Sequence, residues 1–151
     1  MILYLIRHGH AEERDTFKGK DIDRPLTAEG QKRAKEAFSN FLKKYKQPKA
    51  ILASQAVRSV ETASILGELC GVKYDICPSI NPGAEIKDYI NLIGDWRHAD
   101  VLAVVGHEPD LSETASFIVS GGALRMELKK GSIIHIEDSV LINLIQQKAL
   151  L

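Results

Sequence analysis

The stretch ILYLIRHG, residues 2–9, joins an unbroken apolar run to an abrupt polar end. An apolar run without polar alternation is typical of a strand that is buried on both of its faces. Strands of this kind occur in parallel sheets that helices cover on both sides. Residues 2–6 therefore predict a central strand, and Arg7 and His8 follow at its carboxyl end.

The rest of the chain alternates short apolar runs with amphipathic segments. Strands are predicted at residues 50–53, 72–77 and 101–105, helices at 27–48, 54–70, 86–93 and 109–120, and a closing hairpin at 132–136 and 140–145. Thr27 and Ser54 are the predicted N-caps of the first two helices, and Gly71 ends the second. The alternation predicts a single three-layer α/β domain over residues 1–151, with a mostly parallel central sheet, helices on both faces and a C-terminal antiparallel hairpin.

The composition argues against several classes of protein, among them nucleic-acid-binding, membrane and secreted proteins. The chain has 151 residues, of which 44% are hydrophobic and 26% charged, as in ordinary soluble globular proteins. Its 20 Lys and Arg balance 20 Asp and Glu, which argues against a surface built to hold nucleic acid or an anionic membrane. No apolar run approaches the roughly 20 residues of a membrane span, and the N-terminus lacks the basic region of a secretory signal. The two cysteines form neither a zinc set nor a disulfide framework, so a cytoplasmic protein is expected.

Polar side chains follow three of the predicted strands, at the sheet edge where ligands of open α/β sheets bind. Arg7 and His8 follow the first strand, Ser54 follows the second, and His107 follows the strand at 101–105. Arg58 lies one helical turn after Ser54 and shares its face of the helix. We therefore expect two guanidinium groups and two imidazoles to meet at one edge of the sheet.

This combination of side chains suits a phosphoryl group. Arginine offers planar, bidentate donors to phosphate oxygens, and helix N-termini after Ser54 and at Pro109 add partial positive charge. A neutral imidazole can attack phosphorus and form a covalent phosphohistidine, while a second, protonated imidazole binds the equatorial oxygens. No metal or other cofactor is required, and the phosphate-binding GxxxxGK[ST] motif is absent.

Four motifs carry a resemblance to a known family. They are LIRHG at 5–9, RPLTAEG at 24–30, SQAVRSVETA at 54–63 and VGHEP at 105–109. The chain resembles the histidine phosphatase superfamily, which has the phosphoglycerate-mutase-like fold, and within it the SixA-type phosphohistidine phosphatases. The matches follow the family's order from residue 1 to about residue 120.

The resemblance implies roles for individual residues. His8 becomes the phosphorylated nucleophile, and Arg7, Arg58 and His107 become the phosphate pocket. Larger family members place an acidic proton donor after the third strand, where Glu85 is the counterpart in this sequence. Two alternatives stay open: Glu108 beside His107 is the donor, or Glu85 only favours the start of a helix.

The substrate expected from these features is phosphohistidine on another protein. Its leaving imidazole needs less help from an acid than the alkoxide of a phosphate ester. The short interval between Arg58 and His107 also leaves little chain for a lid over a small sugar. We therefore expect a protein phosphohistidine phosphatase that forms a covalent phosphohistidine intermediate.

Other functions compete with this interpretation. The first is a phosphatase of the same superfamily for small phosphate esters. The second is a metallohydrolase that uses His8 and His10 as an H-x-H pair, and the third is a non-catalytic module that binds phosphoproteins. The basic stretch at residues 31–49 is either a solvated helix face or a docking patch for an acidic partner.

Overall fold

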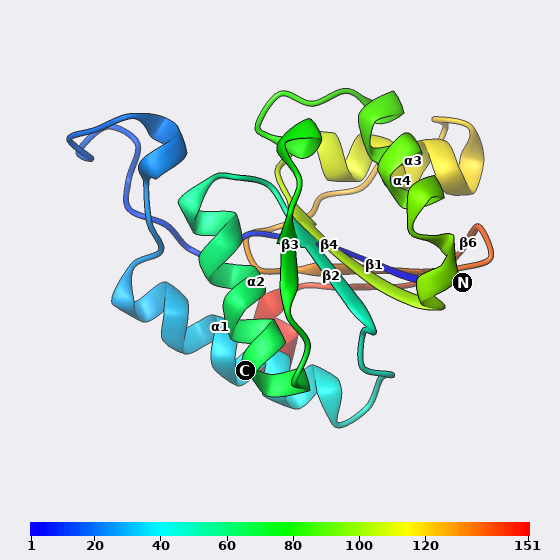
Figure 1. Ribbon diagram of the computed structural model, residues 1–151, viewed down its shortest axis with the longest axis horizontal. Coiled ribbons are helices and arrows are strands. Elements are labelled where there is room, and N and C mark those ends of the chain that lie inside the picture. The colour runs from blue at the N-terminus through cyan, green and yellow to red at the C-terminus, as the bar shows by residue number, and fades with distance from the viewer.

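The apolar run near the N-terminus forms strand β1 (Ile2–Arg7), which is central in a six-stranded sheet. Figure 1 shows the computed structural model, which describes residues 1–151. The strand order is β3-β2-β4-β1-β5-β6. β1 pairs in parallel with β4 (Val101–Gly106) and antiparallel with β5 (Ile133–Glu137). The prediction of a central first strand is confirmed.

The remaining elements complete the predicted architecture. The other strands are β2 (Ala50–Ala53), β3 (Tyr74–Ile76) and β6 (Val140–Ile145), and the α-helices are α1 (Ala28–Leu42), α2 (Val57–Cys70), α3 (Ile86–Asp95) and α4 (Asp110–Ser120). Strands β3, β2, β4 and β1 are parallel, and the hairpin of β5 and β6 adds two antiparallel strands beside β1. The predicted fold class is therefore confirmed. No helix has the length and apolar character to span a membrane.

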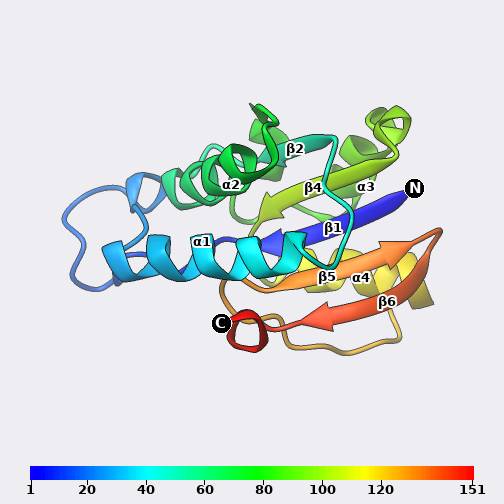
Figure 2. The same cartoon turned by 90° about the horizontal axis from the view of Figure 1, so that it is seen from below.

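The two faces of the sheet carry separate cores because successive side chains of a strand point to opposite faces. Tyr4 and Ile6 pack with buried residues of α1 and α2, among them Phe38. Leu3 and Leu5 pack on the other face with α3 and α4. In Figure 2, α1 and α2 lie on one side of the sheet and α3 and α4 on the other. Both faces of β1 are thus covered, as its unbroken apolar sequence requires.

The predicted end of α1 and the predicted start of α2 are wrong. α1 ends at Leu42 rather than near Pro48, because a tighter turn follows in which the N–H groups of Lys44 and Tyr45 both donate to Phe41 O at 3.0 Å. α2 begins at Val57, and Ser54 does not cap it; Ala56 is the capping position. Thr27 does cap α1, since its Oγ1 accepts a 2.9 Å hydrogen bond from the Gly30 N–H.

Gly30 sets how closely α1 approaches the loop after β1. A Cβ at this position would collide with the His10 carbonyl oxygen, which accepts the Thr27 N–H at 3.0 Å. We expect Gly30→Ala to lower the free energy of unfolding by ~1–3 kcal/mol, as overpacking typically does. Urea denaturation measures this loss.

Gly94→Ala is the matched control, because a Cβ at Gly94 in α3 meets no atom within 4 Å. There the substitution should stabilise the protein by up to ~1 kcal/mol, because alanine favours the helix. Equal effects at the two positions would contradict the close approach of α1 to His10.

Candidate active site

The ends of three neighbouring strands bring the predicted site residues together. Arg7 is aligned with Gly106 in the parallel pairing of β1 and β4, and the His8 N–H donates to Gly106 O at 3.1 Å. On the other side of β4, the Ser54 N–H donates to Val105 O at 3.3 Å. His8 and His107 therefore leave the sheet side by side, with their ring centroids 5.3 Å apart.

The protonation of His8 is fixed by its surroundings. The side chain is only 6% exposed, and its Nδ1–H donates to Gly9 O at 2.7 Å. This hydrogen bond leaves the lone pair on Nε2. Burial, together with the neighbouring charges of Arg58 and Arg7, lowers the pKa of His8 to about 2. His8 is therefore a neutral imidazole with a nucleophilic Nε2 at physiological pH.

His107 is held by two hydroxyl groups. Its Nε2 lies 2.6 Å from Ser54 Oγ and 3.2 Å from Ser59 Oγ. Burial lowers the pKa of His107 to about 3, and the positive charge of Arg58 acts in the same direction. The structure thus differs from the expectation of a protonated second histidine. A bound dianion would raise this pKa, because an opposite charge nearby favours the imidazolium.

Each of the two predicted arginines is held by hydrogen bonds from its Nη atoms, and its Nε–H has no partner. Arg58, only 2% exposed, donates through Nη1 to the Asp21 backbone oxygen at 2.8 Å and through Nη2 to Asp21 Oδ2 at 3.1 Å. Arg7 donates through Nη1 to Leu128 O at 2.9 Å. The Nε atoms of both arginines and Nδ1 of His107 are buried without a hydrogen-bond partner. Buried polar atoms are rarely left unpaired, so this cluster is suited to receive an anion.

Asp21 is a residue of the site that the sequence reasoning missed. It lies in a short 3-10 turn (Asp21–Asp23), and its carboxylate contacts Arg24 at 3.1 Å as well as Arg58. Burial alone would raise the pKa of Asp21, but the guanidinium groups of Arg58 and Arg24 hold it below its ordinary value. Asp21 is therefore ionised and orients the guanidinium of Arg58. Its only signal in the sequence is the three-residue spacing to Arg24.

The structure separates the two proposed proton donors. Glu85 occupies the N-cap of α3 in a capping box with Asp88, and its carboxylate is 71% exposed and 3.6 Å from Lys87. No hydrogen bond or ion pair joins it to the four predicted site residues. Glu108 directly follows His107 in the sequence, and its negative charge raises the pKa of Arg7 against the effect of burial. Its Oε1 accepts the Ser112 N–H at 2.8 Å in the first turn of α4.

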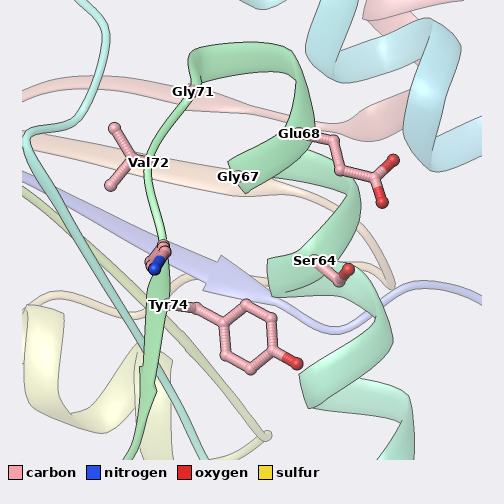
Figure 3. Close-up of a pocket in the computed structure, with 7 residues that line it drawn as sticks. Ser64, Gly67, Glu68, Gly71, Val72 and Tyr74 are labelled. Carbon is pink, nitrogen blue, oxygen red and sulfur yellow. The ribbon is translucent and has the colours of Figure 1, made fainter.

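One cavity of the molecule lies away from this site. It has a volume of about 490 Å³ between the C-terminal part of α2 and β3, and Figure 3 shows its lining residues, Tyr74 and Gly71 among them. It shares no residue with the histidine and arginine cluster. No group of three or more His, Cys, Asp or Glu side chains is placed to hold a metal ion, so the pair of His8 and His10 lacks a third ligand.

Comparison with known proteins decides the family. The family model of the histidine phosphatase superfamily (branch 1) matches residues 3–81. The chain belongs to this superfamily. This histidine phosphatase is also 33% identical over 142 residues to an uncharacterised protein of Picosynechococcus sp., a match that covers 91% of this chain and 86% of that protein.

Solved structures share the fold of this histidine phosphatase at low sequence identity. The protein histidine phosphatase SixA complexed with tungstate superimposes with a TM-score of 0.84 at 19% identity, over 100% of both chains. The α-ribazole phosphatase from Shigella flexneri gives a TM-score of 0.74 at 17% identity, over 97% of both chains. The recognised family and the fold class are thus both confirmed, and the protein is an enzyme of the phosphatase type.

The ion pair between Asp21 and Arg58 predicts an anion-dependent stability. Asp21→Ala leaves a buried guanidinium without its carboxylate, and we expect the free energy of unfolding to fall by ~1–3 kcal/mol. Inorganic phosphate supplies a replacement anion, so it should raise the Tm of the variant more than that of the wild type. Thermal denaturation with and without phosphate measures both effects.

Asp15→Ala in the same loop is the control, because the exposed Asp15 makes no hydrogen bond or ion pair through its side chain. Its response to phosphate should equal that of the wild type. A phosphate response of Asp21→Ala no larger than that of Asp15→Ala would contradict the role given to Asp21.

The two buried imidazoles predict how stability depends on pH. Their ordinary pKa is 6.5, but in the folded protein the pKa values fall to about 2 and about 3. Below pH 6.5 the unfolded chain therefore binds protons that the folded protein does not, and stability falls with pH down to about pH 3. Between pH 7 and pH 5, each imidazole should lower the free energy of unfolding by on the order of 1–2 kcal/mol.

Urea denaturation of the wild type and His107→Asn at pH 7 and pH 5 checks this expectation. The variant should lose less stability between the two pH values than the wild type, whatever its absolute stability. An equal loss in both proteins would show that His107 is not held neutral by the fold.

Proposed function

We propose that this histidine phosphatase hydrolyses phosphohistidine on another protein, through a covalent phosphate on its own His8. The observation that carries the proposal is the state of His8, a buried, neutral imidazole whose Nδ1–H is bound to Gly9 O. Its Nε2 is left as the nucleophile, beside the unpaired Nε donors of Arg7 and Arg58.

In the proposed first step, Nε2 of His8 attacks the phosphorus of the substrate. A new P–N bond forms to His8 as the P–N bond to the substrate histidine breaks, and the leaving imidazole takes up a proton from solvent water. Arg7, Arg58 and His107 bind the phosphoryl oxygens, where negative charge develops. Water then attacks the phosphorus of phospho-His8, which releases inorganic phosphate and restores the neutral imidazole.

Two acidic residues, Glu85 and Asp21, are poorly suited to donate a proton, and this supports phosphohistidine as the substrate. Glu85 is committed to the N-terminus of α3, and Asp21 is held ionised by arginines. Neither is a ready proton donor. The imidazole leaving group of phosphohistidine needs less protonation than an alkoxide, so this arrangement fits it better. The likeness in fold to the protein histidine phosphatase SixA supports the same substrate class.

A phosphatase for small phosphate esters is the second candidate. Glu108 favours it, because this carboxylate directly follows His107 in the sequence and its negative charge acts on Arg7. The likeness in fold to an α-ribazole phosphatase points the same way. Comparing kcat/KM for a phosphohistidine protein with that for a panel of small esters separates the two. Preference for the esters by orders of magnitude would contradict a phosphohistidine substrate.

Covalent catalysis at His8 is tested by rapid quenching during turnover. The wild type should carry an acid-labile phosphate, and His8→Ala should carry none and be inactive. Arg58→Ala should lose on the order of 10²–10³ in rate, as enzymes do when they lose a preorganised charged donor.

His98→Ala, which removes an exposed histidine outside the site, serves as the control and should trap phosphate like the wild type. Activity of His8→Ala equal to that of the wild type would overturn the mechanism.

A further inference from the structure

A cavity lined by basic side chains lies beside a segment that is hydrogen-bonded to the proposed phosphate site. It has a volume of about 520 Å³, and six of its lining residues are His10, Arg33, Lys129, Lys130, Gln147 and Lys148. The segment that carries the two consecutive lysines is bonded directly to the site. The Gly131 N–H donates to His8 O at 2.9 Å and to Arg7 O at 3.1 Å, and Leu128 O accepts from Arg7. We call this cavity the basic pocket.

The charge of the basic pocket is uncompensated. Arginine and lysine side chains line it from α1, from the segment before β5 and from the C-terminal 3-10 turn (Gln147–Leu150), and no carboxylate does. None of these four cations takes part in an ion pair. Burial lowers the pKa of His10, and the charges of Arg33, Lys130 and Arg7 lower it further. One imidazole therefore lies within the field of both the pocket and the phosphate site.

Gln147 adds an unused donor at the wall of the basic pocket. The side chain is 2% exposed, and its Oε1 accepts a 3.2 Å hydrogen bond from Arg33 Nε. Its Nε2 is buried without a partner, and so is Nδ1 of His10. Leaving a buried amide donor unpaired is costly, whereas an acceptor in the pocket would satisfy it. An amide N–H beside a guanidinium and several ammonium groups matches a carboxylate.

We propose that the basic pocket binds an Asp or Glu side chain of the protein substrate, next to the phosphohistidine. This inference rests on the proposed function for the identity of the partner. Lys129 and Lys148 are exposed at the surface, so an acidic side chain of a folded protein can reach the pocket from solvent. Because the pocket and the phosphate site share the segment at Leu128–Gly131, one substrate surface can fill both.

Peptide binding tests the pocket without any hydrolysis. The probe is a fluorescein-labelled peptide with four aspartates around an unphosphorylated histidine, and its counterpart carries asparagines instead. Fluorescence anisotropy should show the wild type binding the acidic peptide more tightly than the neutral one. Lys129→Gln/Lys148→Gln should raise the Kd for the acidic peptide about tenfold, because two charge contacts are lost.

The matched control is Lys43→Gln/Lys44→Gln, which removes the same charge from exposed lysines just after α1. The control should bind the acidic peptide like the wild type. Equal binding of both peptides to the wild type, or an equal loss in the two double variants, would overturn the proposal. The second result would instead place docking on the basic stretch at residues 31–49.

Gln147→Leu tests the amide donor separately, with its folding checked by thermal denaturation. A folded variant should bind the acidic peptide several-fold more weakly, and unchanged binding would remove Gln147 from the proposal. The lysine variants keep the pocket testable if this variant does not fold. Because the peptide carries no phosphate, its binding holds or fails independently of phosphate trapping at His8.

Discussion

The parallel pairing of β1 with β4 is the constraint on which the site depends. It aligns Arg7 with Gly106, so the two histidines that follow leave the sheet at the same level with their rings 5.3 Å apart. On the opposite flank of β1, the antiparallel strand β5 brings Gly131 onto the backbone oxygens of Arg7 and His8. His8 is therefore positioned by backbone hydrogen bonds to β4 on one side and to the segment before β5 on the other. This leaves its side chain free for chemistry.

The electrostatics of the site follow from packing arginines and imidazoles into a small buried space. Arginine keeps its charge there, whereas the imidazoles become neutral, because burial and neighbouring cations both disfavour the imidazolium. Asp21 compensates part of the positive charge from the loop side. The result is a positive site with a neutral imidazole at His8, which is the combination that the proposed attack on a phosphate requires.

The strand-end residues were predictable because their positions follow from strand order alone. Arg7, His8 and His107 lie within two residues of the end of an apolar run, and Arg58 lies in the first turn of the next helix. Asp21 was not predictable, since a polar loop has no periodicity that shows where it folds back. The neutral state of His107 depends on burial, which spacing does not report. The basic pocket joins segments more than 100 residues apart, so no local pattern could indicate it.

The central place of β1 also has a consequence for how the chain folds. Its partners, β4 and β5, begin about 100 and 130 residues later, at Val101 and Ile133. During synthesis β1 therefore emerges first and stays unpaired until most of the chain has followed. Strand pairings between residues this distant in sequence slow folding, and they leave hydrophobic surface exposed in folding intermediates. The arrangement that holds His8 in the folded protein thus slows the folding of the chain, because β1 must wait for partners that are made much later.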